Sequence, residues 1–465
     1  MTSPKHLLFP VETSNRELDY RLAMSVMAAR GDNRIYIGLH ETLMRLAGRL
    51  TGGVYLGKGA IRPHAYDELD DYHLLKNRGF VVVHFDTEGA IYPGAEQRWR
   101  KILYQRLDPR LMDGEDYICT WGDFQRDAYR DLKPSCRDNI RTTGHPRFDL
   151  YKKKWRSYYS ADAASLRARL GDFVLINTNF THANNKMGTD FVFSPGSGYH
   201  PEDLESRLNT VRDWAYMNKQ LSHYVRLVHR LHRVLPDLPV VVRPHPTEDP
   251  SFYRAAFQGL PSVHVLYEGP VGPWLIASRA MIHDGCTTGV EAHLSGARII
   301  NYRPVDDEGR DFYLPNLFGV RCTEEDEVID CLMDMIDAGS HADVFDDSHR
   351  IGLRARQLLN NLSAESFPMM LDVLDEAQAK VRRTESPPDV ALHVEEAFYE
   401  ALEGAKNLLR PLSPRHRRAA EYSRRKFPGF DPLEVERSLH RFEAIAGRQV
   451  NHRIISRALM VVEAK

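Results

Sequence analysis

Short runs of β-branched and other apolar residues alternate with longer helical or polar stretches along most of this chain. The first series of runs lies at residues 6–11, 34–39, 53–56, 80–86, 116–120 and 140–143, and the second at 173–178, 240–243, 263–267, 280–283 and 298–302. Strands that alternate with helical segments are typical of βα units and of a mostly parallel sheet. Two such series predict an α/β protein with two Rossmann-like domains.

The segment 151–170 is polar and basic, has no strand pattern, and would join the two halves. We therefore expect an N-terminal Rossmann-like domain at 1–160 and a second one at 161–375. Beyond about residue 355 no further strands are expected, and the remaining apolar residues show helical spacing. Residues 376–465 are accordingly predicted to form a helical C-terminal extension.

The charge balance excludes some partners. The 465 residues contain 62 Lys plus Arg against 64 Asp plus Glu, a net charge of -2, so the chain as a whole has no signature of nucleic-acid binding. No run of about 18 apolar residues could span a bilayer, and the first ten residues lack the cleavage site of a secretory signal. We expect a cytoplasmic protein.

Carboxylates follow two predicted strands of the first half, and the loops after strands are where ligands bind in open α/β sheets. Glu12 comes after the first strand, and Asp86 and Glu88 come after the fourth. These residues are candidates for acid-base chemistry. The alternative is structural, because Thr13 or a neighbour could cap a helix that begins near residue 16.

The second half carries a more specific pattern at the end of a buried strand, Arg243-Pro-His-Pro. The prolines fix the backbone on both sides of His245, so its imidazole is held rigidly at a strand end. It could donate to a phosphate oxygen and help a nucleotide leave, and Arg243 could share that charge. Taken alone, His245 is better explained as a turn histidine bonded to a neighbouring carbonyl.

A second motif, at the end of another strand, favours a phosphate-binding role for His245 over that structural explanation. After the strand at 280–283 the chain reads Asp-Gly-Cys-Thr-Thr-Gly-Val-Glu, from Asp284 to Glu291. The turn from Gly285 to Gly289 would start a helix whose free N–H groups, with the hydroxyls of Thr287 and Thr288, suit a phosphate. Glu291 could accept hydrogen bonds from ribose hydroxyls. The turn is neither a P-loop nor a dinucleotide fingerprint, which disfavours kinases and dinucleotide enzymes.

Metal binding is not expected. His229 and His232 have i, i+3 helical spacing, but arginines surround them. No carboxylate lies at a helical spacing that would put it on the same face, which favours a solvated basic face. No Asp-x-Asp pair is present to hold a cation against a diphosphate, and none of the five cysteines forms a C-x-x-C pair. We therefore predict a metal-independent site without a cofactor.

These motifs resemble known ones. The Arg243-Pro-His-Pro and Asp284-Gly-x-Thr-Thr segments are similar to motifs of GT-B glycosyltransferases that use CMP-activated sugars, including sialyltransferases and capsule Kdo transferases. Residues 8–19, 86–89, 121–122, 143–149 and 426–429 resemble the bacterial surface carbohydrate biosynthesis protein family, so the resemblance covers nearly the whole chain. The family often has a second acid where this chain has Thr87.

The resemblance implies a GT-B glycosyltransferase with an acceptor half, a nucleotide-sugar half and a cleft between them. Its donor would be CMP-Kdo or a related CMP-nonulosonate, and its acceptor a lipid-linked glycan of O-antigen, capsule or lipopolysaccharide. His245, Thr287 and Thr288 would bind the CMP phosphate, and Glu291 the ribose. Asp86, Glu88 or Glu12 would act as base or would stabilise an oxocarbenium-like transition state.

Three other functions stay open. A CDP-glycerol-type polyol phosphate transferase shares the fold and a His-Pro motif, a UDP-GlcNAc 2-epimerase-like isomerase shares two Rossmann-like domains, and a non-catalytic glycan-assembly scaffold would retain only the fold. Residues 406–426 carry eight Lys or Arg against one acid, a stretch that could hold the protein on the anionic inner membrane as a peripheral contact. A solvated helical face explains that segment slightly better, because aromatic and leucine anchors are sparse there.

Overall fold

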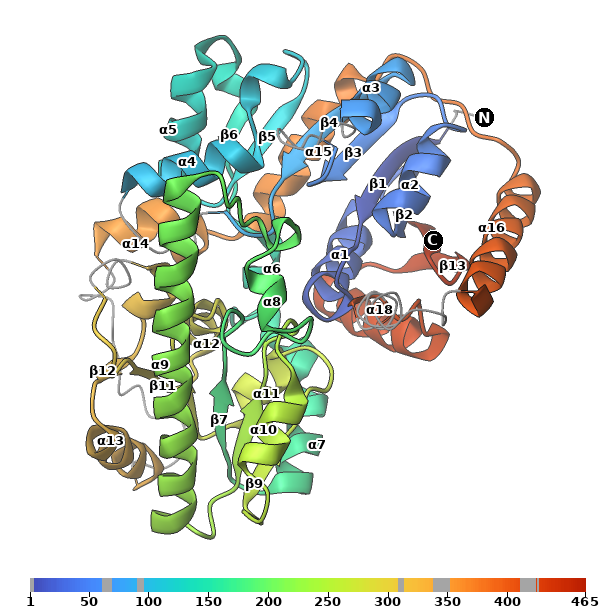
Figure 1. Cartoon of the computed structure of the whole chain (residues 1–465). Coiled ribbons are helices and arrows are strands. Elements are labelled where there is room, and N and C mark those ends of the chain that lie inside the picture. Colours follow the sequence, from blue (N-terminus) through green and yellow to red (C-terminus); the bar gives the residue numbers. More distant parts are fainter. Residues whose placement is uncertain are drawn as a thin grey trace. The chain divides into compact units, whose positions relative to one another are not determined.

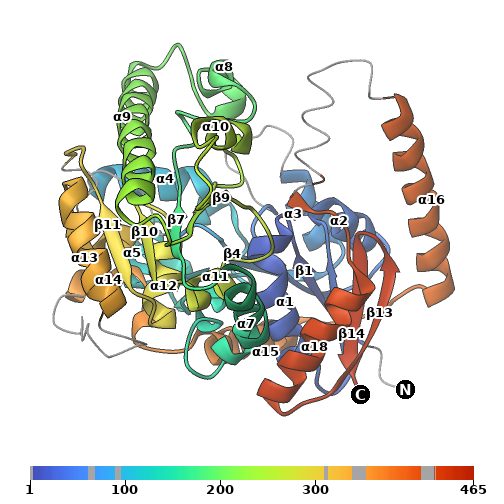
Figure 2. The ribbon, with the colours of Figure 1, turned by 90° about the horizontal axis from the view of Figure 1, so that it is seen from below.

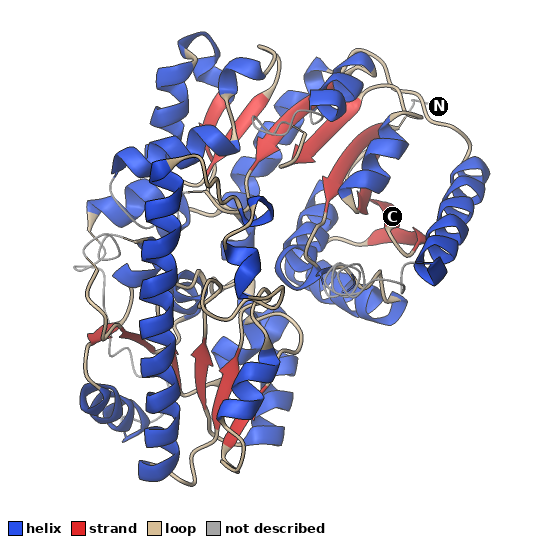
Figure 3. Ribbon diagram, in the orientation of Figure 1, coloured by secondary structure: helices blue, strands red, loops and turns tan. Residues whose placement is uncertain are grey.

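The chain, seen as a computed structural model, is described for residues 4–60, 69–89, 96–307, 313–337, 352–409, 424 and 426–465. The described residues form two compact units. The first unit contains the residues up to Leu150 together with those from Leu353 onward, and the second contains the residues from Tyr151 to Gly352. In each unit, helices flank a central set of strands (Figures 1 and 3).

The first unit is built on an eight-stranded sheet with the order β13-β14-β2-β1-β3-β4-β5-β6. Its N-terminal elements are β1 (Lys5–Pro10), α1 (Ser14–Ala28), β2 (Asn33–Gly38), α2 (His40–Ala47), β3 (Gly53–Gly57), α3 (Leu69–Asn77), β4 (Phe80–Phe85), α4 (Glu96–Arg106), β5 (Tyr117–Thr120), α5 (Asp123–Leu132), β6 (Ile140–Thr142) and α6 (Pro146–Asp149). Strands β1 to β6 are parallel. β2, β3 and β4 are buried along their whole length, as expected for parallel strands covered on both faces.

The C-terminal part of the chain returns to this first unit. It contributes α14 (Leu353–Leu358), α15 (Ser366–Lys380), α16 (Asp389–Leu409), α18 (Pro432–Ala446), β13 (Val450–Ser456) and β14 (Leu459–Ala464). Asn361, just before α15, donates to Asp149 at 2.8 Å, and the Phe367 N–H donates to the same carboxylate at 2.8 Å. These bonds join the returning chain to α6. The two compact units therefore divide near residues 150 and 352, whereas the sequence predicted domain boundaries at 160 and 375.

The predicted wholly helical C-terminal extension is wrong in one respect, because it ends in a β-hairpin. β13 and β14 are antiparallel, and β14 adds to the edge of the sheet beside β2, also antiparallel. Figure 2 shows this hairpin beside the N-terminal strands. The hairpin covers the edge of β2, whose N–H and C=O groups would otherwise lack strand partners.

The second unit has a six-stranded parallel sheet with the order β12-β11-β10-β7-β8-β9. Its elements are α7 (Ser160–Leu170), β7 (Val174–Asn177), α8 (Thr189–Val192), α9 (Leu204–Val234), β8 (Val240–Arg243), α10 (Pro250–Ala256), β9 (Val263–Val265), α11 (Gly272–Ala277), β10 (Ala280–His283), α12 (Thr288–Ser295), β11 (Ile299–Tyr302), β12 (Val320–Cys322) and α13 (Glu325–Asp337). In chain order this is the Rossmann arrangement 3-2-1-4-5-6, read from β9 to β12.

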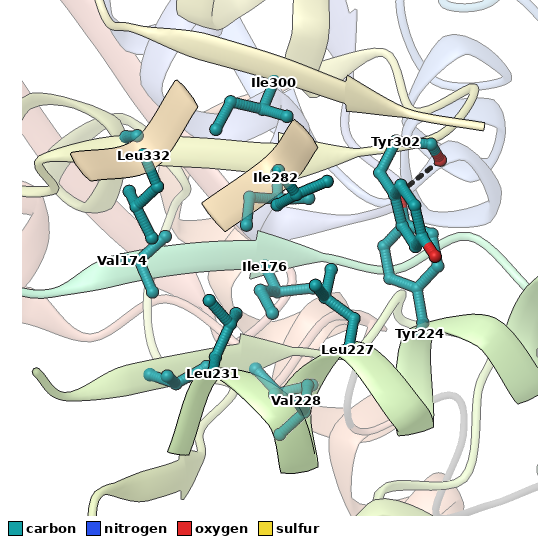
Figure 4. Packing of buried hydrophobic residues seen from close by; sticks show 14 of the residues in the cluster. Val174, Ile176, Tyr224, Leu227, Val228, Leu231, Ile282, Ile300, Tyr302 and Leu332 are labelled. Atoms are coloured by element: carbon teal, nitrogen blue, oxygen red, sulfur yellow. Dashed lines mark hydrogen bonds between the residues drawn. The ribbon is translucent and has the colours of Figure 1, made fainter. Parts of the chain in front are cut away.

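Long apolar side chains from the strands and from α9 form the core of the second unit (Figure 4). Leu227, Val228 and Leu231 recur at helical spacing along α9 and pack on the sheet. The Tyr224 hydroxyl donates to the Tyr302 carbonyl at 3.1 Å, which satisfies the polar end of a buried ring. This packing fixes the strands whose ends carry the candidate site.

The prediction of an α/β protein with two Rossmann-like sheets, the building blocks of the GT-B fold, is confirmed. All eleven predicted strand runs coincide with observed strands, and β12, β13 and β14 were not predicted. None of the helices in the described part of the chain combines the length and the apolar character needed to cross a bilayer.

Candidate functional site

The carboxyl ends of β7, β8 and β10 lie next to one another in the second unit, because β7 pairs with both of the others in parallel. The chain runs from β7 outward to β8 and β9, and then crosses to β10 on the other side of β7. The order of strands therefore reverses between β7 and β10. In open α/β sheets, ligands bind outside the carboxyl ends of the strands at such a switch point.

The loops after these three strands are joined by hydrogen bonds. The Asn179 side chain, after β7, donates to the Gly285 carbonyl, after β10, at 2.9 Å. The His245 N–H, after β8, is 3.3 Å from the Thr178 hydroxyl. The expectation that the His245 loop and the Gly285 turn lie at strand ends of one sheet is confirmed, and the loop after β7 connects them.

The geometry of His245 fixes which ring nitrogen can donate. The Thr247 N–H is 3.3 Å from Nδ1, and the Thr247 hydroxyl is 2.8 Å from the same atom. Because a backbone N–H can only donate, Nδ1 of the neutral imidazole must be the acceptor, and the ring proton is on Nε2. The half-buried ring can therefore donate from Nε2 to an acceptor such as a phosphate oxygen.

The turn after β10 needs its glycines. Gly285 has φ of 60°, a conformation that side chains with a Cβ rarely adopt, and its N–H donates to Asn316 at 2.8 Å. A Cβ on Gly289 would lie 2.6 Å from His283 Cε1 and 2.9 Å from the Pro315 carbonyl oxygen. The first turn of α12 is thus packed directly over a buried side chain.

The start of α12 offers hydrogen-bond donors. Thr287 occupies the N-cap position without a side-chain cap bond. The Gly289 and Val290 N–H groups donate to the Cys286 and Thr287 carbonyls at 2.9 and 3.0 Å, which leaves the N–H groups of Thr287 and Thr288 as the donors without a backbone acceptor among the described residues. The Thr288 hydroxyl is buried and has no partner among the described residues. Below it, burial lowers the pKa of His283 to about 3, so that this imidazole is neutral. Because the ring carries no charge, the positive end of the helix dipole is what favours an anion at this position.

Two predicted binding residues are engaged in other ways. The Arg243 guanidinium donates to the carbonyls of Glu268, at 2.8 Å, and Gly269, and it lies 4.8 Å from the centre of the Tyr267 ring. Glu291 is buried within α12 and interacts electrostatically with Arg243. Both side chains are buried, so a ribose would have little access to them.

Glu248 was missed by the sequence reasoning. This carboxylate is 1% exposed, and it accepts hydrogen bonds from the N–H groups of His245 at 2.8 Å and Phe180 at 2.6 Å, and from the hydroxyls of Thr178 and Tyr253. Burial raises its pKa to about 7. Its place three residues after His245 was a usable signal, because a Glu side chain at that spacing can reach back to the backbone N–H three residues earlier, as in a capping box.

Two further polar groups at this edge were also missed. Asp284 accepts hydrogen bonds from the Tyr216 hydroxyl at 2.9 Å and from the Gln220 amide at 3.1 Å, which ties the turn to α9. Asn179 bridges to the turn itself. Both Asp284 and Asn179 directly follow predicted strands, so the strand-end rule would have found them.

In the first unit, the predicted carboxylates lie in a charged cluster at the corresponding edge. Lys58, which follows β3, is 3.1 Å from Glu12 and 2.8 Å from the Thr87 hydroxyl, and Glu17 lies 3.7 Å away. Burial would lower the pKa of Lys58, but Glu17 and Glu12 raise it above its ordinary value. Lys58 therefore stays charged and connects the loops after β1 and β4.

Asp86 and Glu88 are also paired with cations. Arg106 donates to both oxygens of Asp86, at 2.6 and 2.7 Å, while Arg16 is 3.3 Å from Glu88. Burial would raise the pKa of Asp86, but the Arg106 guanidinium holds it well below its ordinary range. A carboxylate with so low a pKa is a poor general base at neutral pH, and the bidentate pair instead fixes the position of Arg106.

The two histidines of α9 each have their own partner. His229 Nε2 is 3.0 Å from the Ala256 carbonyl, and His232 Nδ1 is 2.6 Å from the Ser262 hydroxyl. The nearby Arg226 is paired with Glu325 of α13 at 3.0 Å, so the predicted solvated basic face is partly braced against a neighbouring helix. Across the described ranges, no group of three or more His, Cys, Asp and Glu side chains is placed to hold a metal ion.

The sequence matches no protein-family model and no curated protein. Similar solved structures include a UDP-GlcNAc 2-epimerase from Neisseria meningitidis bound to UDP-GlcNAc, with 10% identity, a TM-score of 0.47 and coverage of 80% of this chain and 100% of that one. Another is a UDP-GlcNAc 2-epimerase from Methanocaldococcus jannaschii in complex with UDP-GlcNAc and UDP. It has 9% identity and a TM-score of 0.46, and the match covers 80% of this chain and 99% of that one. The wall teichoic acid polymerase TagF has 10% identity and a TM-score of 0.44, and the match covers 82% of this chain and 90% of that one. With TM-scores below 0.5, none of them assigns an activity to this chain.

Proposed function

We propose that this chain is an enzyme of surface-glycan assembly that uses a nucleotide-activated sugar or polyol, and that its second unit binds the phosphate adjoining the nucleoside. The His245 Nε2 proton and the N–H groups of Thr287 and Thr288, at the start of α12, stabilise the charge that develops on the departing phosphate. No metal ion is needed in this scheme, because protein donors supply the stabilisation, and we expect turnover to survive chelation of divalent cations.

One observation carries the proposal: His245 and the N-terminus of α12 lie at adjoining strand ends, on the two sides of the switch point between β7 and β10. A neutral imidazole with its proton on Nε2, a helix N-terminus and a buried threonine hydroxyl are all donors. Donors suit a phosphate and would repel a cation. The motif resemblance to enzymes with CMP-activated donors is independent support from the sequence.

The first candidate donor is CMP-Kdo or a related CMP-nonulosonate, transferred to a lipid-linked glycan. This reaction passes through an oxocarbenium-like transition state and benefits from a carboxylate near the anomeric carbon. Glu12 and Glu88 are the available candidates in the first unit, because their ion pairs are longer than those of Asp86. Glu12 is 3.1 Å from Lys58, and Glu88 is 3.3 Å from Arg16 and 3.9 Å from Arg106, whereas Arg106 binds both oxygens of Asp86 at 2.6 and 2.7 Å. In this proposal Asp86 positions Arg106 and does not transfer a proton.

A second candidate, a CDP-glycerol-type polyol phosphate transferase, is favoured by a specific observation. Each of the three predicted catalytic carboxylates is paired with Lys58, Arg16 or Arg106. Attack on phosphorus needs donors and cations around the transferred phosphate more than it needs a carboxylate at a sugar carbon. The donors described above would serve either reaction, so the donor must be identified by experiment.

Isothermal titration with a panel of nucleotides tests the proposed function. We expect CMP to bind, and we expect cytidine to bind about 10- to 100-fold more weakly, because it lacks the phosphate that makes charge-assisted hydrogen bonds. Turnover of CMP-Kdo or a CMP-nonulosonate would assign the sugar transferase, and turnover of CDP-glycerol the polyol phosphate transferase.

Other results of the same titration would overturn the proposal. Binding of UDP and UDP-GlcNAc without binding of CMP would favour the UDP-GlcNAc 2-epimerase-like isomerase. Binding of none of these nucleotides by the folded protein would favour the non-catalytic scaffold. Equal binding of cytidine and CMP would remove the phosphate from the recognition scheme.

We also propose that the enzyme meets its lipid-linked acceptor at an anionic membrane surface, through α16. One face of this helix is apolar and exposed, with Val390, Val394 and Phe398 exposed by 73%, 66% and 61%. Two acidic side chains of the helix pair with another part of the first unit: Glu396 with Arg45 of α2 and Glu395 with Arg49. Figure 2 shows α16 on the outer side of the first unit, beside the hairpin.

The sequence that follows this apolar face is strongly basic. Residues 406–426 hold eight Lys or Arg against one acid, although most of that segment lies outside the described residues. An exposed apolar helix face next to a basic segment fits an anionic lipid surface, because it combines buried apolar area with electrostatic attraction. The apolar anchors that the basic segment lacks are thus supplied by α16.

We expect the full chain to sediment with vesicles containing about one-third anionic phosphatidylglycerol, and only weakly with neutral vesicles. The double substitution V394E and F398E should lower the bound fraction about tenfold, because it removes exposed apolar area and adds two negative charges. L204E and L208E on α9 are matched controls, since Leu204 and Leu208 are similarly exposed in the second unit, and they should leave binding unchanged. Equal sedimentation of both double variants would exclude α16 as the contact.

A further inference from the structure

Arg21 is a buried cation in the first unit with no hydrogen-bonded anion among the residues that the structure describes. The residue is 2% exposed, and its Nε and Nη1 atoms have no hydrogen-bond partner among the described residues. The guanidinium is surrounded by rings, 5.1 Å from the centre of Tyr20 and 5.6 Å from the centres of Phe9 and Phe85. Ring faces compensate only part of the cost of burying a charge.

Two more buried donors lie beside it. The Arg147 N–H donates to His145 Nδ1 at 3.0 Å, so the neutral ring carries its proton on Nε2, and that atom has no partner among the described residues. Burial, together with Arg147 and Arg21, holds the pKa of His145 well below its ordinary value. The Tyr20 hydroxyl is equally without a partner in the described part of the chain.

These groups belong to one cluster. The His145 ring is 5.1 Å from the Tyr20 ring and 4.5 Å from the Phe85 ring, measured between centroids. Arg21 contacts two of the same rings, Tyr20 and Phe85. Buried donors are normally satisfied in native proteins, so three such groups in one place indicate that an acceptor is missing.

The cluster lies at the end of the sheet where ligands bind. Phe85 is the last residue of β4, Phe9 is next to the last residue of β1, and His145 follows β6. These are carboxyl ends of parallel strands. Arg147, a second buried arginine, lies 4.8 Å from the Phe148 ring beside it, which adds positive potential.

We infer that Arg21, Tyr20 and His145 bind an oxyanion group, a carboxylate or a phosphate, in the first unit. A guanidinium, an imidazole N–H and a phenol O–H are all donors, and a guanidinium matches two oxygens of one oxyanion. The view that this oxyanion belongs to the glycan acceptor of the transfer reaction rests on the proposed function. The existence of the site does not, because it follows from the unsatisfied donors alone.

Thermal unfolding of the full chain tests the site, with inorganic phosphate compared with chloride at equal ionic strength. Phosphate should raise the melting temperature of the wild type by about 2–4 °C. Arg21→Met should melt at or above the wild-type temperature in chloride, because it removes an unpaired buried charge, and it should lose the phosphate-induced rise. Acetate in a parallel series distinguishes a carboxylate site from a phosphate site.

Two variants complete the test. Arg34→Met is the matched control, because Arg34 is also buried but is paired with Asp389 at 2.7 Å and Glu463 at 3.0 Å; it should melt lower than the wild type and keep the phosphate-induced rise. Tyr20→Phe removes only a hydroxyl and should reduce that rise without lowering the melting temperature in chloride. This variant keeps the test valid if the larger change impairs folding.

The outcomes separate this site from the proposed nucleotide site. Phosphate could also bind near His245, so the informative quantity is the difference between the wild type and Arg21→Met, which should persist in a His245→Ala background. If Arg21→Met keeps the full phosphate-induced rise, the anion binds elsewhere and the proposal fails. If it melts as far below the wild type in chloride as Arg34→Met does, Arg21 has an acceptor within the protein and the proposal also fails.

Discussion

Replacing His245 by alanine should lower the turnover of the nucleotide-activated donor by about 10²-fold or more, because the departing phosphate loses one hydrogen-bond donor. The loss should appear mainly in kcat, since the bond to Nε2 strengthens as negative charge develops on the leaving oxygen. The substitution leaves the backbone N–H bond to Glu248 in place, so the variant should fold. Steady-state kinetics with the donor identified by the nucleotide panel provide the measurement.

Two other substitutions make this result specific to the Nε2 proton. His245→Gln places an amide N–H near the position of Nε2 and should recover part of the lost kcat. His229→Ala, in the same unit but bonded to the Ala256 carbonyl, should leave kcat unchanged. Wild-type turnover by a folded His245→Ala enzyme would remove this residue from the mechanism, whatever the donor proves to be.

Most strands could be predicted because parallel strands covered on both faces must be apolar along their length. The run Val240–Arg243 shows this, with four buried positions in a row. β12 (Val320–Cys322) lies at the sheet edge and is only partly buried, so it has no such pattern. For short edge strands, pairing with a neighbour determines the structure more than local composition does.

The C-terminal hairpin could have been predicted in part. Arg453-Ile-Ile-Ser and Met460-Val-Val-Glu are β-branched runs separated by only three residues, a spacing that is compatible with a hairpin. What the sequence could not reveal is its partner, because β14 pairs with β2, more than 400 residues earlier in the chain. The same limit applies to the domain boundary, since the bonds between Asn361 and Asp149 connect distant segments.

The candidate site was predicted at the level of single loops. His245 and the Gly285 turn could be recognised because their local sequences are unusual. Glu248 is also within reach of local reasoning, through its spacing from His245, but Thr178 could not be assigned to the same site, because the order of β8, β7 and β10 in the sheet is not evident from the order in the chain. Likewise, the pairing of Asp86 with Arg106 depends on how α4 packs, which no local pattern indicates.

Replacing Glu248 by alanine should lower the free energy of unfolding by about 2–4 kcal/mol, because the buried N–H groups of His245 and Phe180 lose their acceptors. Denaturant unfolding followed by circular dichroism measures this change. Glu202→Ala is the control, since Glu202 is exposed and its loss should change stability by about 0.5 kcal/mol at most. Wild-type stability of Glu248→Ala would show that these bonds contribute nothing.

The pH dependence of the same measurement tests whether Glu248 titrates near neutrality. Its pKa is raised from 4.5 to about 7 by burial, so between these values the folded protein holds a proton that the unfolded chain has released. Stability therefore falls as the pH rises from about 4.5 to about 7, by roughly 3 kcal/mol for this group. The Thr178 hydroxyl can accommodate both states, because it can donate to the carboxylate or accept from the protonated acid.

Glu248→Gln isolates this contribution. The amide keeps the shape of the side chain and one acceptor but cannot titrate, so the variant lacks the pH-dependent loss. The wild type should exceed the variant in stability by more at pH 5.5 than at pH 8, because only the wild type is destabilised as the carboxyl group ionises. A difference that stays constant between the two pH values would mean that Glu248 keeps one protonation state throughout, and that the hydrogen bonds of the His245 loop do not change with pH.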